Sequence, residues 1–125
     1  RFIVSTGTSL SAVGQSSDVP TGFPYSLSVA GTNALSIRQY IESKNCIDLV
    51  GQSITISVWI KQSSGAGSSA MYIYLAYANT ADTFSGLTQI GSSVNLNTTS
   101  SWAQYTATFT NLPSGAAPNN SPCVP

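Results

Sequence analysis

The chain has 125 residues, the size of one domain that is large enough to bury a sizeable core. Only 6% of its residues are charged, and four Lys or Arg balance four Asp or Glu, so the net charge is zero. This balance lacks the basic patch of a nucleic-acid binder, and no run approaches the roughly 18 apolar residues of a membrane helix. With 42% hydrophobic residues the composition is not that of a disordered chain. Uncharged, hydroxyl-rich sequences of this kind are typical of β-sandwiches on extracellular or virion surfaces.

The first third of the chain predicts short strands separated by turns. Residues 2–4 are a short apolar run, and residues 13–20 predict a loop or an edge strand. Two prolines and a glycine make 20–24 a turn, and the alternating residues 25–29 predict a strand. Because the chain has no initiator Met and begins directly with a strand-like run, we expect it to be a processed piece of a longer protein.

Residues 35–42 alternate again and predict the next strand. We expect the core side of this strand to be formed by Leu35, Ile37 and Ile41. The outward side would then carry Arg38, Tyr40 and Glu42. Residues 44–50 predict a single helical turn before Gly51.

The clearest strand is 54–61, where every second residue is a β-branched aliphatic. A period of two over eight residues predicts a β-strand with one face in a core, and β-branched residues favour a pleated surface over a helix. The two faces are Ile54, Ile56, Val58 and Ile60 against Thr55, Ser57, Trp59 and Lys61.

The rest of the chain continues this pattern. Residues 62–69 predict a hairpin loop, 71–77 a strand, 79–86 a loop, 87–90 and 93–96 short strands, and 102–110 a last strand. The predicted core residues of the two longer strands are Met71, Ile73, Leu75, Tyr105, Ala107 and Phe109. We therefore predict an all-β antiparallel sandwich of jelly-roll type over residues 1–112, followed by an irregular proline-rich tail over 113–125.

Four segments in this order, residues 18–27, 38–42, 48–61 and 102–109, resemble a jelly-roll module of bacteriophage tail-fibre and other virion proteins. Such modules are similar to carbohydrate-binding and galactose-binding-like modules. The resemblance covers roughly residues 1–112, and it implies a sandwich fold in a virion or cell-surface setting. Modules of this kind usually continue after the Leu112–Gly115 turn with two more strands, whereas this chain continues with residues 116–125. Either the sandwich is smaller than usual, or a neighbouring chain fills its open edge. Because an open sheet edge invites pairing with another chain, we expect assembly.

The chain has no histidine, which removes the commonest general base, the commonest metal ligand and any Ser-His-Asp triad. Glycoside hydrolysis would need two carboxylates brought together by the fold, either Asp18 with Asp82 or Glu42 with Asp48. The simpler interpretation places these acids alone on loops or in surface ion pairs. Calcium binding through Asp18 or Asp82 is a further alternative. We predict a protein that is not an enzyme and has no cofactor or resident metal.

Cys46 and Cys123 are the two cysteines, and the sequence leaves two alternatives open. They form a disulfide, or they remain two unpaired thiols, since the sequence fixes neither their distance nor the redox compartment.

The predicted outward faces carry most of the large polar and aromatic side chains. The candidate ligand-binding or protein-contact residues are Arg38, Tyr40, Glu42, Trp59, Lys61, Tyr72 and Tyr74. If their strands lie in one sheet, these residues form an aromatic strip with Trp59 in its middle. Such a strip suits a protein interface or a sugar-binding platform. The remaining alternative is a face that is buried under the molecule's own loops, such as residues 22–24.

From these observations we predict a non-enzymatic structural or adhesive virion protein, of the tail-fibre or capsid-decoration type. The alternative is a carbohydrate-binding module of a secreted enzyme or adhesin. The expected partners are other virion subunits or a second copy in a homo-oligomer, with a host surface glycan as a further possibility. The expected location is the virion or, in the alternative, the secreted fraction.

Overall fold

The structure is a computed structural model that describes residues 2–6, 10–31, 35–41, 47–63, 71–79, 86–110, 112 and 123–124. The described residues form β-strands and one short 3₁₀ helix, η2 (Ile47–Leu49), which confirms the helical turn predicted before Gly51. The strands are β1 (Phe2–Thr6), β2 (Leu10–Ser16), β3 (Ser26–Gly31), β4 (Leu35–Gln39), β5 (Ile54–Ile60), β6 (Tyr72–Ala78), β7 (Leu87–Asn95), β8 (Ala103–Phe109) and β9 (Cys123–Val124).

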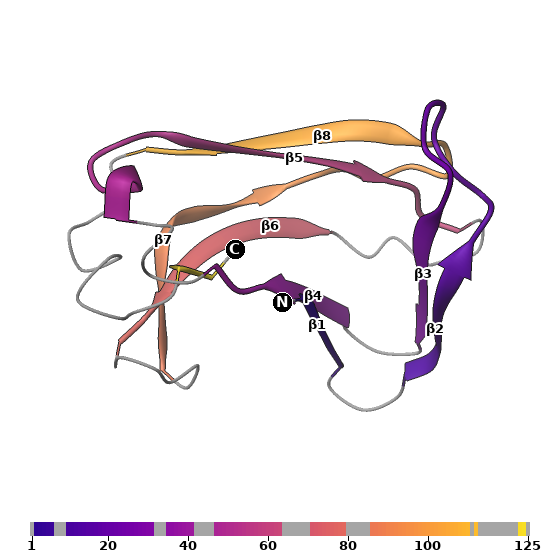
Figure 1. The fold of residues 1–125 in the computed structure, drawn as a ribbon, viewed down its shortest axis with the longest axis horizontal. Coiled ribbons are helices and arrows are strands. Elements are labelled where there is room, and N and C mark those ends of the chain that lie inside the picture. Colours follow the sequence, from indigo (N-terminus) through magenta and orange to yellow (C-terminus); the bar gives the residue numbers. More distant parts are fainter. Residues whose placement is uncertain are drawn as a thin grey trace.

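Every strand pair is antiparallel, which confirms the predicted all-β antiparallel class. The described strands pair as β1 with β4, β2 with β3, β5 with β8, and β7, β6 and β9 in that order. Figure 1 shows β5 and β8 above β6 and β7, and β4 with β1 on the other side of β6. The β2–β3 hairpin lies at one end of the molecule and runs across the direction of β5 and β8 (Figure 1).

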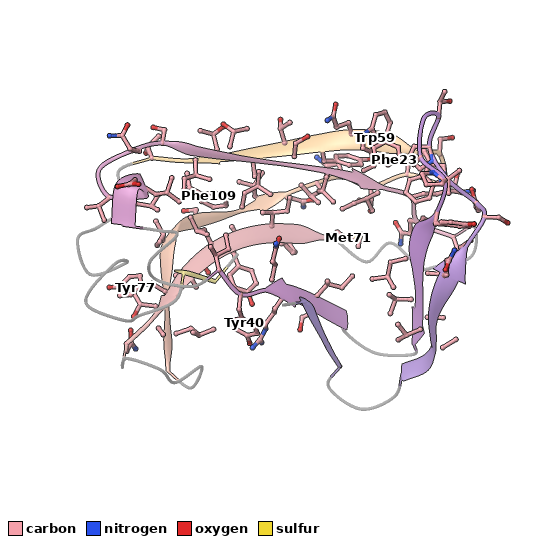
Figure 2. All side chains as sticks on the ribbon, in the orientation of Figure 1. Phe23, Tyr40, Trp59, Met71, Tyr77 and Phe109 are labelled. Carbon is pink, nitrogen blue, oxygen red and sulfur yellow. The ribbon has the colours of Figure 1, made fainter. Side chains whose placement is uncertain are left out.

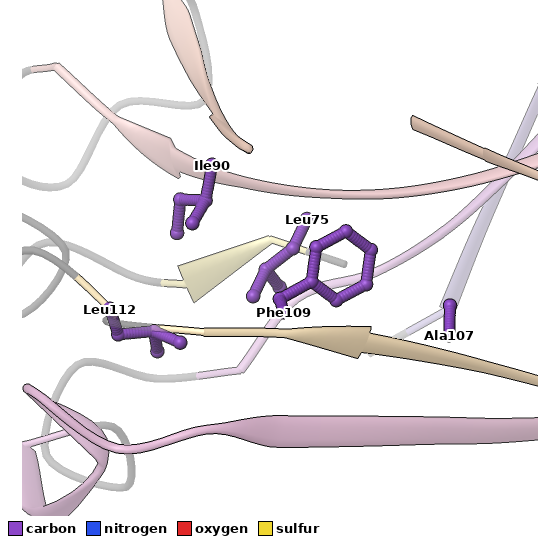
Figure 3. Close-up of a cluster of buried hydrophobic side chains, with 5 residues drawn as sticks. All are labelled: Leu75, Ile90, Ala107, Phe109 and Leu112. Carbon is purple, nitrogen blue, oxygen red and sulfur yellow. The ribbon is translucent and has the colours of Figure 1, made fainter. Parts of the chain in front are cut away.

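The core lies between the β5–β8 sheet and the β7–β6–β9 sheet. Its buried residues come from β6, β7 and β8 and from the residue that follows β8: Leu75, Ile90, Ala107, Phe109 and Leu112 (Figure 3). Ile54 and Ile56 of β5 and Ile73 of β6 pack against this cluster. Burial of these side chains from both sheets stabilises their face-to-face arrangement through the hydrophobic effect.

The predicted alternation of β5 is confirmed residue by residue. Its even positions are half-buried, whereas Thr55, Ser57 and Trp59 are exposed. β8 repeats the pattern, with Ala107 and Phe109 buried. The pairing continues beyond both strand ends, where Gly51 N donates to Leu112 O at 2.9 Å and Gln62 N donates to Thr99 O at 2.9 Å. The two strands are thus held in register over their whole length.

The predicted core side of residues 35–42 is wrong at Ile37 and correct at Ile41. Ile37 is 46% exposed, whereas Ile41, just beyond β4, packs against the core cluster. Arg38 and Tyr40, which were expected to point outward, are half-buried, and Arg38 lies beside Tyr74 of β6. The physical reason is that the long stem of Arg38 and the ring of Tyr40 are themselves largely apolar, so they cover β6 while their polar ends find partners. A pattern of alternating residues does not say which face is covered when both faces offer apolar surface.

The tail differs from the irregular segment predicted for 113–125. Cys123 and Val124 form β9, which pairs with β6 opposite Tyr77 and Ala76. Ala76 is only 1% exposed, and a buried strand edge without backbone partners is costly. Part of the edge that was expected to be filled by a neighbouring chain is therefore filled by this chain. Residues 113–122 lie outside the described residues.

One continuous strand, β7, replaces the two short strands that were predicted over 87–90 and 93–96. A bulge explains the break in the pattern. Ile73 pairs with Val94 and Leu75 pairs with Ile90, so Tyr74 alone stands opposite three residues of β7. Bulges of this kind bend a strand and leave the extra residues out of the ladder.

Candidate functional site

The predicted contact residues come from three different sheets. β4 pairs with β1, β5 pairs with β8, and β6 lies between β7 and β9. The continuous aromatic strip from Tyr40 through Trp59 to Tyr72 and Tyr74 is therefore wrong as a single surface. It depended on the assumption that consecutive strands are neighbours in one sheet. The structure divides the residues into two groups, one around Trp59 and one around Arg38.

Trp59 lies on the outward side of β5 and is 39% exposed. Phe23, from the turn before β3, packs against it with ring centroids 6.4 Å apart and ring planes tilted by 59°. Figure 2 shows the two rings together near one end of β5. Phe23 is itself 49% exposed, so the loop around residues 22–24 covers Trp59 only in part. The two rings form a tilted aromatic corner that is open to solvent.

Asp18 connects the Phe23 turn to the β5–β8 sheet. One carboxylate oxygen accepts a hydrogen bond from Lys61 Nζ in an ion pair, and the other accepts a hydrogen bond from Trp102 Nε1 at 2.8 Å. The Lys61 ammonium and then the Trp102 indole hold the pKa of the Asp18 carboxyl below its usual value. This confirms the surface ion pair expected for the acids in the case of Asp18. It also leaves Lys61 with its charge compensated.

The sequence analysis included Lys61 in the contact face, but it named Asp18 only as a carboxylate or calcium candidate and Phe23 only within a covering loop. It did not predict the bonds of Asp18 to Lys61 and Trp102. Asp18 is 43 residues from Lys61 and 84 residues from Trp102 in the chain. No local periodicity joins residues so far apart. The available signal was the turn at 20–24, whose two prolines restrict the path of the loop that carries Phe23.

The exposed side of β5 and β8 carries Trp59 and otherwise uncharged polar side chains. We call this side the outer face, and it comprises Thr55, Ser57, Trp59, Gln104, Thr106 and Thr108. Thr55 and Thr108 share a hydrogen bond of 2.9 Å between their hydroxyl oxygens, and Gln104 Nε2 donates to Ser57 Oγ at 2.6 Å. Cross-strand pairs of this kind fix side-chain positions on a sheet. The outer face is therefore a flat polar surface that ends in the aromatic corner.

Arg38, Tyr40 and Tyr74 form the second group, between β4 and β6. A hydrogen bond to Tyr40, supplemented by the neighbouring Tyr74, raises the pKa of Arg38 above its usual value. Arg38 Nε is buried and has no hydrogen-bond partner among the described residues. Because Arg38 and the two tyrosines are half-buried, this group connects two layers of the fold.

Tyr72 belongs to neither group. It is 55% exposed at the start of β6 and pairs in register with Asn95. Glu42 and Cys46 lie outside the described residues, as do Asp82 and the side chain of Cys123. The predicted carboxylate pairs and the possible disulfide therefore remain predictions.

No group of three His, Cys, Asp or Glu side chains comes together among the described residues. Both carboxylate oxygens of Asp18, which was one alternative for calcium, are bonded to Lys61 and Trp102. In the part of the chain that the structure describes, no helix is long and apolar enough to cross a membrane.

Comparison with protein-family models finds none that matches the chain, and neither curated proteins nor solved structures give a significant match.

Proposed function

We propose that the chain is a non-enzymatic structural and adhesive module of a virion, of the tail-fibre or capsid-decoration type. In this proposal its strands follow jelly-roll order, and it binds a second copy of itself through the outer face around Trp59 and Phe23. The sequence resemblance to phage virion modules supports the setting. The chain's lack of histidine supports a binding role over a catalytic one.

The observation that carries the proposal is the exposed aromatic corner. Trp59 and Phe23 remain 39% and 49% exposed although each already packs against the other. Large aromatic residues on a rigid surface are the commonest energetic centres of protein interfaces. The Asp18 bonds to Lys61 and Trp102 hold the turn that carries Phe23 in place, so binding would order little additional chain.

The β2–β3 hairpin supports assembly independently. Val13 and Leu27 lie on the same side of it and are 48% and 52% exposed. No charged residue and no proline occurs in either strand, although such residues commonly prevent edge pairing. An isolated two-stranded hairpin is at best marginally stable in water, so contact with a neighbouring subunit would stabilise it.

Sedimentation of the purified chain over a wide concentration range tests the proposal. The wild-type chain should form a discrete oligomer, and Trp59→Ala should weaken its association at least about 10-fold, as expected for a central aromatic contact. Tyr72→Ala is the matched control, because Tyr72 is also an exposed aromatic residue but lies on another sheet. A chain that stays monomeric at all concentrations, or equal effects of the two variants, would contradict the proposal.

A carbohydrate-binding module is the second candidate. Gln104 stands directly across from Trp59, and its amide is fixed by Ser57, so an aromatic ring and an oriented polar group are neighbours. Sugar sites combine such groups. On a glycan array this candidate predicts a signal that Trp59→Ala removes and Tyr72→Ala preserves, and a monomeric chain would be compatible with it.

A further inference from the structure

A cavity of about 310 Å³ lies between the bulge of β7 and the end of β8. Its lining residues are Ile90, Gly91, Ser92, Ser93, Val94, Thr108, Phe109 and Thr110. Thr108 also belongs to the outer face, but neither the aromatic corner nor the Arg38 group contributes a residue to this lining. The volume lies at the low end of the range of about 300–1,000 Å³ typical of ligand sites.

Backbone geometry creates the cavity. Tyr74 alone stands opposite Gly91, Ser92 and Ser93, so these three residues bulge out of the ladder. Gly91 has a φ of 66°, which glycine adopts without strain. Gln89 Nε2 donates to Gly91 O at 3.0 Å and holds the bulge. Bulges are frequent beside functional sites because they redirect side chains and release backbone groups from the ladder.

The opposite wall is a strand edge. β8 pairs with β5 on one side, and no described strand pairs with its other side. An unpaired strand edge presents backbone N–H and C=O groups. Hydrogen-bonding groups therefore come from both walls, from the hydroxyl-bearing residues Ser92, Ser93 and Thr110 and from the main chain.

The chemistry of the lining selects the ligand. No Lys, Arg, Asp or Glu lines the cavity, and a charged ligand would lose its hydration without gaining a counter-charge. Ile90 and Phe109 line the cavity at the edge of the core, and since they are only 6% and 4% exposed they offer a ligand a narrow apolar strip (Figure 3). The ligand should thus combine one apolar face with several neutral hydroxyl groups, in the size of a single ring.

We propose that the cavity between the Gly91–Ser93 bulge and the edge of β8 binds one neutral sugar residue. The apolar face of the ring lies towards Ile90 and Phe109, and its hydroxyl groups bond to the serines and to backbone groups of the two walls. The site contains neither Trp59 nor Phe23, although it shares Thr108 with the outer face.

An NMR titration of the ¹⁵N-labelled chain with glucose, galactose, mannose and N-acetylglucosamine tests the proposal, with glucuronate as the charged comparison. At least one neutral sugar should shift the amide signals of Gly91, Ser92, Ser93 and Thr110 in a saturable way, and glucuronate should bind at least 5-fold more weakly, because it would bury an unpaired charge. The double variant Ser92→Ala/Ser93→Ala should weaken binding about 3- to 10-fold, the loss expected for hydrogen bonds to neutral hydroxyl groups.

A matched control keeps the result specific. Ser53→Ala/Ser63→Ala also removes two exposed serine hydroxyl groups, but from residues outside the cavity lining and outside the outer face, so it should not change sugar binding at the cavity. The amide spectrum of each variant shows whether it remains folded, which is expected because Ser92 and Ser93 are exposed. Three results would each overturn the inference: no saturable shift at residues 91–93, equal binding of glucuronate, or the same loss of binding in Ser53→Ala/Ser63→Ala as in Ser92→Ala/Ser93→Ala.

Discussion

Two antiparallel strand pairs of this molecule have similar sequences but different surroundings. The β5–β8 pair alternates apolar and polar residues, and the apolar side packs against β6 and β7. In the β2–β3 hairpin only β3 alternates, and its Leu27, like Val13 on the same side of β2, remains about half exposed. A period of two therefore identifies a strand in β3 as it does in β5 and β8. Only the path of the chain around it decides whether its apolar side is covered.

The difference has an energetic consequence. Burial of apolar surface stabilises β5–β8 directly, and each substitution there removes part of the core. The hairpin gains little from burial within this chain, so its stability depends on local backbone conformation or on a neighbouring subunit. Matched substitutions in the core and in the hairpin should therefore differ in the size of their effect on stability. A second pair, of one glycine in β7 and one in β2, should differ in the sign of that effect.

Phe109→Ala and Leu27→Ala should show the largest difference. Phe109 is 4% exposed in the core, and truncation of a buried phenylalanine costs about 3–5 kcal/mol of unfolding free energy. Leu27 is 52% exposed, and a surface truncation changes stability by about 0.5 kcal/mol or less. Urea unfolding at low protein concentration measures both values. Similar losses in the two variants would mean that the hairpin is covered even in the single chain.

Gly91→Ala and Gly14→Ala should have effects of opposite sign. Both glycines lie within strands, and an added Cβ would meet nothing within 4 Å at either position. Gly91 has a φ of 66°, and a side chain in this left-handed region costs about 1–2 kcal/mol. Gly14 is outside that region, so alanine there should stabilise by about 0.4–1 kcal/mol through the unfolded chain. Thermal unfolding of the two variants gives the comparison, and a stabilised Gly91→Ala would contradict the bulge geometry.

Local periodicity predicted the parts of this fold that depend on a single strand. The inward residues of β5 and β8 were correct because apolar or aromatic residues occupy every second position and mostly polar residues lie between them. The facing of β4 was wrong, since Arg38 and Tyr40 contain enough apolar surface to replace Ile37 over β6. The bulge of β7 and the pairing of β9 depend on β6, and neither strand's own sequence specifies that partner.

The candidate site, like the fold, was predictable only where it depends on the sequence of a single strand. Trp59 was found because it occupies a polar position in the clearest strand, where an exposed aromatic residue is unexpected. Its partner Phe23 and the bonds of Asp18 depend on a turn that returns to the sheet from far along the chain. Contacts of this kind follow from the tertiary path of the chain, which the periodicity of a single strand does not specify.

The smallest expected effect concerns pH and the connection of the Phe23 turn to β5–β8. Lys61 and Trp102 lower the pKa of Asp18 in the folded chain, whereas the unfolded chain has the ordinary value of about 3.9. The ion pair therefore stabilises the fold at every pH above the unfolded value, and this contribution is lost as the pH falls through the lowered folded value. The effect on stability should be small, because Asp18 is exposed and Lys61 only half-buried, so that solvent screens their attraction.

The titration of the Asp18 carboxyl carbon, followed by NMR, measures this effect more directly than unfolding does. Lys61→Met removes the largest cause of the lowered pKa, so the Asp18 pKa should rise towards its ordinary value. The indole N–H signal of Trp102 should titrate together with Asp18, since it donates to the same carboxylate, and Asp18→Asn should abolish that titration. An Asp18 pKa that is unchanged in Lys61→Met would show that the ion pair does not persist in solution. The turn that carries Phe23 would then be held mainly by Trp102, and the aromatic corner would be less rigid than the structure indicates.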